Sequence, residues 1–363
     1  MKNKPILSDM SKISEDMMGP GKCKEYSIYV DPHSTPDFVK EEKRRVIPAF
    51  PIIYEIADHT WQVNEFGMSS FYVLAGRERG LVIDCGCGSI DAKSLIEHLC
   101  PLPYDVAITH GHGDHCGSMC QFEKVWIFPE DIPLIRDGFR VNQQLWENPN
   151  IWGSFPARYP DGTPMDAPGC TAGGKVYYDY TNLTFMGIDP EHLPEMQELK
   201  DGQVFDLGGR RVEVLHMPGH TRGCAVFIDP KTRIAFTGDS FNQSFRLAGN
   251  TAAENVKLLK KLQKHCSEFD RMFPGHTAVG ANTANFSQSP QLLPDVIRAY
   301  QSIADGTAVV KEKVLHGRTI KVAVYGKAEV ALDEKPPEGE KALPEGETAA
   351  ELEIVAGRET AAG

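Results

Sequence analysis

The chain has 363 residues, of which 41% are hydrophobic, so it can bury one large core or two small ones. Its formal net charge of −12 argues against a nucleic-acid partner, because binding a phosphate backbone usually needs a basic face. The first 20 residues hold no continuous apolar run and no later stretch reaches transmembrane length, so neither a signal peptide nor a membrane partner is expected.

Residues 1–50 are polar and irregular, and we expect them to form an N-terminal surface segment. From residue 51 onward, short runs rich in β-branched and aromatic residues alternate with turn residues, which predicts an antiparallel meander. Residues 91–99 have helical spacing, and 104–110 form a short apolar run that ends at His110. A histidine-rich stretch is therefore expected to begin where a buried strand ends.

The segment 125–200 differs from the rest because it is rich in proline, glycine and aromatic residues. A long irregular segment inside a compact domain is usually a functional lid or a partner surface. An ordered insertion that packs its own small core is an equal alternative. The side chains of this insertion that we expect to reach a substrate are Trp146, Trp152, Arg158 and Tyr159.

Strand and helix patterns return after this insertion. In chain order they predict strands at 210–217, 224–229, 233–238 and 269–276, helices at 252–265 and 290–306, and a terminal hairpin over 308–326. Two strand-rich blocks flanked by helices favour two sheets packed face to face with helices outside. Residues 333–363 are acidic, rich in proline and glycine and free of aromatics, which predicts a disordered tail.

Seven polar side chains of metal-binding type lie at the ends of the predicted strands. Four belong to the stretch THGHGDH, and three follow later strands in the motifs PGH, GD and PGH. They are His110, His112, Asp114, His115, His220, Asp239 and His276. Imidazole and carboxylate are the ligands that zinc and related divalent ions prefer. Seven ligands exceed one tetrahedral site, so they favour two ions bridged by one carboxylate and one hydroxide.

Each later motif is weak alone, because a histidine in a Pro-Gly turn is common. The spacing H-x-H-x-D-H followed by PGH, GD and PGH in this order resembles the metallo-β-lactamase-fold superfamily of binuclear metallohydrolases. The resemblance covers roughly residues 50–330 and implies an α+β fold, an αββα four-layer sandwich with the metals at one sheet edge. The domain would then span 51–330 and carry the aromatic-rich insertion.

The resemblance also implies a role for each residue of the site. One ion would be held by His110, His112 and His220. The other would be held by Asp114, His115 and His276. Asp239 would bridge the two ions, and Asp84, in GLVIDCG, would orient a ligand histidine from behind. Asp114 would in addition act in catalysis by relaying a proton.

The chemistry implied by this family is hydrolysis. A water between two divalent ions loses its proton near neutral pH, and the resulting hydroxide attacks an electron-poor carbonyl or phosphorus. Zinc is the favoured ion, although such sites also accept iron or manganese. The substrate would be a small molecule.

Positions at which this sequence differs from known branches of the family narrow the choice of branch. True zinc β-lactamases of the commonest class place a cysteine where Asp239 stands, and diiron flavoproteins usually have a glutamate in place of His112. Lactonases often carry a tyrosine at the position of Asn242, which we include among the candidate substrate contacts. Glyoxalase II-type thioesterases add a C-terminal helical domain that this pattern lacks. What stays is a glyoxalase II/lactonase-like hydrolase of a small ester, thioester or lactone-like substrate.

Three further predictions stay open at this level. The same two ions could serve a phosphodiesterase, an iron-based redox enzyme could use the fold, or a catalytically silent binding module could have kept the fold.

The aromatic residues of 146–180 would suit a homodimer contact as well as a lid. Nine cysteines, an odd number in a chain too large to need disulfides, favour reduced thiols and a cytoplasmic location.

Overall fold

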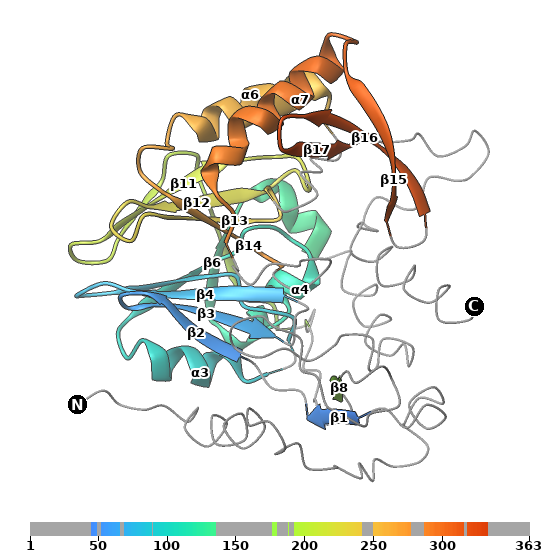
Figure 1. Ribbon diagram of the computed structural model, residues 1–363. Helices are drawn as coiled ribbons and strands as arrows, with labels where there is room; N and C mark the ends of the chain where they lie inside the picture. Colours follow the sequence, from blue (N-terminus) through green and yellow to red (C-terminus); the bar gives the residue numbers. More distant parts are fainter. Residues whose placement is uncertain are drawn as a thin grey trace.

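The computed structural model shows two β-sheets stacked face to face, with helices on their outer faces (Figure 1). The described residues are 45–48, 52–65, 69–88, 90–135, 176–179, 188, 192–241, 250–276, 287–315 and 318–332. The predicted αββα four-layer sandwich is confirmed by this arrangement.

The first sheet contains seven strands that follow the chain from one edge to the other. They are β2 (Ile52–Ala57), β3 (Thr60–Glu65), β4 (Ser69–Ala75), β5 (Gly80–Ile83), β6 (Tyr104–Ala107), β7 (Lys124–Ile127) and β9 (Glu195–Glu198). The pairs from β2 to β5 are antiparallel, as the meander predicted, whereas β5, β6, β7 and β9 are parallel. The carboxyl ends of these four strands therefore share one edge of the sheet.

The second sheet has five strands in the order β10-β11-β12-β13-β14. They are β10 (Val204–Asp206), β11 (Arg211–His216), β12 (Ala225–Asp229), β13 (Ile234–Gly238) and β14 (Arg271–Pro274). Neighbours are antiparallel except β13 and β14, which are parallel. The predicted strands of this half are all present, and the parallel pair brings two carboxyl ends to the same place.

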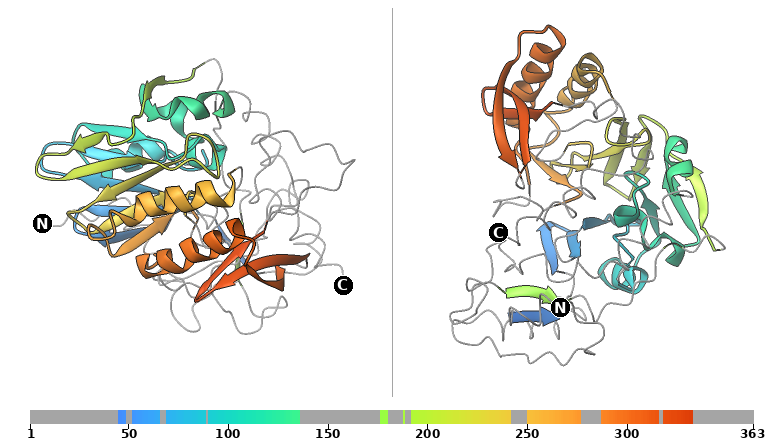
Figure 2. Two further views of the ribbon diagram at one scale, coloured as in Figure 1. Left: turned by 90° about the horizontal axis from the view of Figure 1, so that it is seen from above. Right: turned by 90° about the vertical axis from the view of Figure 1, so that its right-hand side faces the viewer.

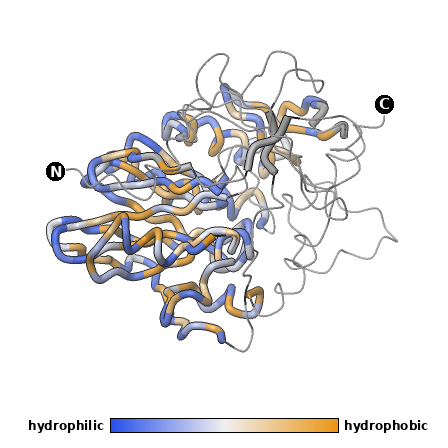
Figure 3. Tube along the Cα trace, turned by 90° about the horizontal axis from the view of Figure 1, so that it is seen from below, coloured by the Kyte–Doolittle hydropathy of each residue, from blue (hydrophilic) through white to orange (hydrophobic). Residues whose placement is uncertain are grey.

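The space between the two sheets is filled by apolar side chains such as Leu74 and Leu81 from the first sheet and Phe227 and Phe236 from the second. All four are fully buried. In Figure 3 the hydrophobic colour follows the strands, and the hydrophilic colour gathers at their turns. This pattern is typical of strands whose inner faces are buried against a second sheet.

Helices cover the outer faces of both sheets. α3 (Ala92–Leu99) packs Ile96 against the first sheet, and its first turn is capped by the Asp91 carboxylate, which accepts a hydrogen bond from Ser94 N. α6 (Ala252–Gln263) and α7 (Leu293–Ala304) cover the second sheet and lie side by side (Figure 2). No helix of the described ranges is both long and apolar enough to cross a membrane.

The remaining described elements lie outside the two large sheets. They are the short helix α4 (Gly113–Cys116), the 3₁₀ turns η1 (Met119–Gln121), η2 (Pro129–Asp131) and η3 (Pro290–Leu292), the pair β1 (Arg45–Pro48) and β8 (Val176–Asp179), and the sheet of β15 (Val309–Leu315), β16 (Arg318–Tyr325) and β17 (Ala328–Ala331). The predicted terminal hairpin corresponds to β15 and β16, and β17 extends it.

Both ends of the segment predicted as an insertion belong to the first sheet. β7 lies at the beginning of 125–200, β9 lies near its end, and the two strands pair in parallel. β9 was missed because its sequence, EMQE, is polar and half exposed. Most of 136–191, nearly all of 1–50 and all of 333–363 lie outside the described residues.

Candidate metal centre

The predicted metal-binding residues converge at one edge of the sandwich. His110 follows β6, Asp239 follows β13 and His276 follows β14, whereas His220 lies in the turn between β11 and β12. Asp114 and His115 are presented by the short helix α4. Ligands of open α/β sheets bind beyond the carboxyl ends of parallel strands, and this edge is such a place.

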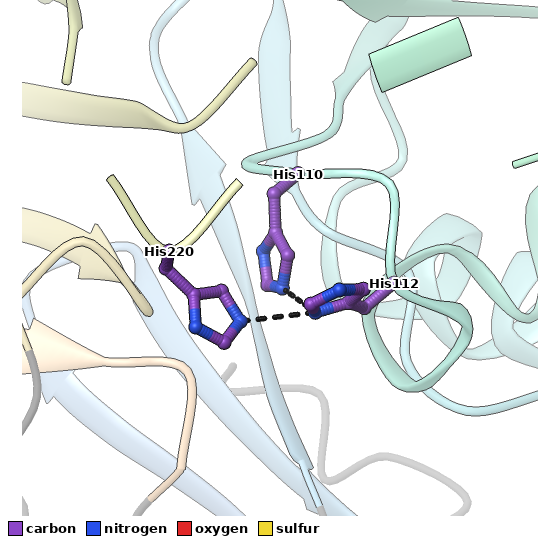
Figure 4. A group of neighbouring side chains, drawn as sticks. All are labelled: His110, His112 and His220. Atoms are coloured by element: carbon purple, nitrogen blue, oxygen red, sulfur yellow. Dashed lines mark hydrogen bonds between the residues drawn. The ribbon is translucent and has the colours of Figure 1, made fainter. Parts of the chain in front are cut away.

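The first group, here called the three-histidine set, consists of His110, His112 and His220. Nε2 of His110 and Nε2 of His220 lie 3.0 Å and 2.9 Å from Nδ1 of His112 (Figure 4). The three rings stand at 80–88° to one another, so their nitrogens point to one small space. Tetrahedral zinc with ligands at 2.0–2.1 Å needs nitrogens about 3.3 Å apart, and the set is close to that spacing.

The second group, here called the mixed set, consists of Asp114, His115 and His276. Nε2 of His115 and Nε2 of His276 are 3.3 Å apart. Oδ2 of Asp114 lies 3.4 Å and 3.3 Å from these two nitrogens. The mixed set is therefore as compact as the three-histidine set, and it differs in carrying a carboxylate.

Asp239 lies between the two sets and is 3% exposed. Its Oδ2 is 3.4 Å from Nε2 of His220 and 3.1 Å from Nε2 of His276, so one oxygen faces both sets. Its Oδ1 is buried and accepts no hydrogen bond from any residue that the structure describes. A buried carboxylate oxygen without a donor is costly, and a cation is the partner that its surroundings fit.

Asp84 lies behind the mixed set. Its Oδ2 is 3.1 Å from Nδ1 of His115, and Thr109 donates to both of its oxygens, from N at 2.6 Å and from Oγ1 at 2.8 Å. The backbone of Asp84 has a φ of 63°, a strained conformation for a residue other than glycine. The hydrogen bond between Asp84 and His115 directs the Nδ1 proton of His115 toward Asp84. It leaves Nε2 of His115 facing the other two members of the mixed set.

Gly275 explains why the last PGH motif needs its glycine. A Cβ atom at this position would come within 2.4 Å of Cε1 of His115 and 2.6 Å of Oδ1 of Asp239. The backbone is held there by Tyr72, a fully buried residue of β4 whose hydroxyl donates to the carbonyl oxygen of Pro274 at 2.5 Å. Tyr72 was not singled out by the sequence, because a short run of strand-forming residues such as SSFYVLA gives no sign of which aromatic residue makes such a contact.

The three-histidine set is neutral at physiological pH. Burial is the largest cause that lowers the pKa of each member, and together with the neighbouring His220 it brings the pKa of His112 to about 3. Neutral imidazole is the form that binds a metal ion.

The mixed set has the opposite electrostatic state. Burial lowers the pKa of His276, but the carboxylates of Asp239 and then Asp114 raise it more, to about 9. The same two carboxylates outweigh burial at His115 and raise its pKa well above the usual value. Without a cation, protons on these two histidines balance the carboxylates of Asp114 and Asp239, so a divalent ion would take over a positive charge that the site already requires.

This difference predicts how metal binding depends on pH. An ion that enters the mixed set has to displace the proton of His276. As the pH falls below 9, the apparent affinity of this set for the ion should therefore fall about tenfold per pH unit for each proton displaced. The three-histidine set holds no such proton, and its affinity should change little between about pH 6 and pH 8. Zinc competition against a chelator would measure this in His220→Ala, which keeps the mixed set, and His276→Ala, which keeps the other. Equal pH slopes in the two variants would contradict the assignment.

The proposed substrate contacts could not be placed. Trp146, Trp152, Arg158, Tyr159 and Asn242 all lie outside the described residues. Besides Tyr72, the structure adds a residue near the site that the sequence did not point to, Asp131 at the end of η2. Its place in the chain could have indicated it, because Asp131 follows β7, and β7 is the parallel neighbour of β6, the strand that leads to His110.

A comparison with family models gives a match whose range contains the site. A family model described as the metallo-beta-lactamase superfamily matches residues 64–276, which is more than half of the chain. The matched range includes Asp84 and all members of the two sets, together with Asp239.

Several curated proteins are similar to the chain. The human acyl-coenzyme A thioesterase MBLAC2 is 27% identical over 186 residues, which cover 47% of this chain and 57% of that protein. The atrochrysone carboxyl ACP thioesterase of Aspergillus novofumigatus is 25% identical, over 59% of this chain and 50% of that protein. The hydroxyacylglutathione hydrolase GloC of Haemophilus influenzae is 24% identical, over 49% and 68%. The chain thus spans about half the length of the first two relatives.

Comparison with solved structures found matches at low sequence identity. An archaeal metallo-beta-lactamase superfamily protein from Sulfolobus tokodaii is 17% identical, with a TM-score of 0.39 over 64% of this chain and 80% of that one. The stereoselective inverting sec-alkylsulfatase of Pseudomonas sp. is 14% identical, with a TM-score of 0.45 over 71% and 42%.

Proposed function

Because the chain belongs to the metallo-beta-lactamase superfamily, we propose that it is a hydrolase that uses two divalent metal ions to cleave a small thioester. The observation that carries the proposal is the convergence of two complete ligand sets on Asp239, whose buried Oδ1 accepts no hydrogen bond from the described residues. A thioester is favoured over other esters and lactones because two relatives are named thioesterases.

The donor atoms of the site suit zinc. One set offers three imidazole nitrogens, and the other offers two imidazoles and a carboxylate. Zinc prefers nitrogen with some oxygen, whereas magnesium and calcium prefer oxygen alone. When bound, two such ions would acidify a water to a pKa of about 7 and polarise the substrate carbonyl. The proposed ligands are those of the three-histidine set, those of the mixed set, and Asp239 between them.

Asp114 is placed to handle the proton of the attacking water. Its side chain is 32% exposed, whereas that of Asp239 is 3% exposed, so Asp114 is the carboxylate of the site that a substrate can approach. Although burial raises its pKa, the charge of His115 lowers it more, so Asp114 is a carboxylate at neutral pH and can accept a hydrogen bond from water. In the proposed reaction a water oxygen bonds to the carbonyl carbon, the carbon–sulfur bond breaks, and Asp114 passes the proton to the leaving thiolate.

The buried histidines and Asp84 keep this arrangement fixed. His110 and His115 have no exposed surface, and His115 is held by its hydrogen bond to Asp84. Side chains locked in this way need no reorganisation during the reaction, which is how a site stabilises developing charge most effectively. No serine or cysteine nucleophile is needed, and burial raises the pKa of the neighbouring Cys116 thiol well above its usual value.

The proposal is tested by a substrate panel on protein of known metal content. We expect hydrolysis of acyl-coenzyme A thioesters to exceed that of aryl esters, lactones and bis-aryl phosphates, to stop after treatment with a chelator, and to return when zinc is added. Activity on the bis-aryl phosphate alone would instead favour a phosphodiesterase. Iron as the bound metal, with no hydrolysis of any substrate, would favour the redox alternative.

A further inference from the structure

Asp131 is a buried carboxylate that the proposed reaction does not use. It is the last residue of η2, which follows β7, and it is 1% exposed. Among the residues that the structure describes, no lysine or arginine forms an ion pair with it. A buried carboxylate without a cation has to be compensated by several hydrogen-bond donors.

Those donors come from the two loops that carry the three-histidine set. Oδ2 of Asp131 accepts hydrogen bonds from the backbone N of Gly111 at 2.8 Å and from Oγ1 of Thr221 at 2.6 Å. Oδ1 accepts one from the backbone N of Gly223 at 2.6 Å. Gly111 lies between His110 and His112, and Thr221 directly follows His220. One side chain therefore joins two loops that are far apart in sequence.

The packing around Asp131 is as close as its hydrogen bonds. A Cβ atom on Gly223 would come within 2.6 Å of Cγ of Asp131, and one on Gly111 would come within 2.9 Å of its backbone oxygen. The hydroxyl of Thr221 also lies 3.1 Å from Sγ of the buried Cys224, which fixes this loop from its other side. The carboxylate of Asp131 thus bridges the two loops next to the ligand histidines, and a backbone hydrogen bond from Ala225 N to the carbonyl oxygen of Thr109, at 2.8 Å, joins the same segments further back.

We propose that Asp131 is a positioning residue that holds Nδ1 of His112 and Nε2 of His220 at the separation that a metal ion requires. The inference rests on the proposed function and extends it to a residue outside both ligand sets. Asp131 acts through the loops, since within the described ranges its carboxylate accepts hydrogen bonds from Gly111, Thr221 and Gly223 and from no histidine of the set.

Asp131→Asn tests the proposal with almost no change in shape. Whichever way the new amide turns, its NH₂ group faces a backbone N–H of Gly111 or Gly223, so two donors oppose each other and the loops must separate. In a His276→Ala background, which isolates the three-histidine set, we expect zinc affinity to fall about 10- to 100-fold, the usual effect of losing such a partner. In a His220→Ala background, which isolates the mixed set, we expect a change of less than about threefold.

Asp229→Asn is the matched control. It makes the same change at a carboxylate that is also buried but is satisfied by Arg210, and it lies at the opposite end of β12 from Cys224. This control should lower the melting temperature and leave both zinc affinities unchanged. If Asp131→Asn fails to fold, Thr221→Val removes a single donor and should lower the affinity of the three-histidine set about three- to tenfold.

The outcomes separate this inference from the proposed function. If the three-histidine set binds zinc equally well with and without the Asp131→Asn substitution, in a protein whose unmutated form binds two zinc ions, the inference alone is overturned. Equal weakening of both sets would also overturn it, because that result describes general destabilisation. Failure of the unmutated protein to bind zinc would overturn the dimetal proposal instead.

Discussion

Asp239→Ala is expected to lower kcat/KM for thioester hydrolysis by at least about 10³-fold and to reduce the bound zinc from two ions to one or none. The reason is geometric, because one oxygen of Asp239 lies 3.4 Å from His220 and 3.1 Å from His276, each in a different set. Removing the carboxylate also leaves the histidines of both sets without the negative charge that they face. Metal analysis and steady-state kinetics on the purified variant would measure both effects.

Asp206→Ala provides the control for this variant. Asp206 is an exposed residue of β10 whose Oδ1 accepts a hydrogen bond from the backbone N of Gly208, away from the site. This substitution should leave activity and zinc content unchanged. If Asp239→Ala kept two zinc ions and an activity within about tenfold of the unmutated protein, Asp239 would not be a bridging ligand.

The second large effect is expected on stability. Arg210→Met should lower the free energy of unfolding by about 3–5 kcal/mol, because it leaves a buried carboxylate without its cation. Nε and Nη2 of Arg210 donate to Oδ2 of Asp229 at 3.0 Å and 2.6 Å, and both side chains are almost fully buried. The same guanidinium donates to Thr60 Oγ1 at 2.7 Å and to the carbonyl oxygen of Ala75 at 3.1 Å, which joins the second sheet to the first.

Urea unfolding of Arg210→Met and of Arg210→Met/Asp229→Leu would measure this effect. The double variant removes both charges, so it should recover much of the stability that the single variant loses. Zinc content at a temperature where both variants are folded should not change, because the pair lies away from the metal centre. A loss below about 1 kcal/mol in the single variant would mean that water reaches Asp229 when Arg210 is absent.

Much of the site could be predicted because its residues follow strands. His110, Asp239 and His276 each come directly after an apolar run, and parallel strands bring such ends together. The spacing of the stretch 109–115 then placed four ligand-type side chains next to one another at the end of the first of these strands. For the same reason the sandwich of two sheets could be predicted from the order of strand-rich and helical segments.

Other features left no local pattern in the sequence. Asp131 stands in the tripeptide PED, which is an ordinary turn sequence, and only the parallel pairing of β6 and β7 brings it beside Gly111. Arg210 follows two glycines and resembles an exposed turn residue, although it is 2% exposed. Whether a charged residue is buried depends on the residues that the rest of the chain packs around it. A local sequence pattern therefore does not predict the burial of Arg210 or Asp131.

The central claim is that two ions act together in one hydrolytic centre. Its most direct test is a titration of chelator-treated protein with zinc, in which thioester hydrolysis is recorded after each addition. We expect activity to rise to a plateau at two zinc ions per chain and to stay there with further zinc. A plateau at one zinc ion per chain would contradict the account. Full thioesterase activity before any zinc is added would contradict it as well.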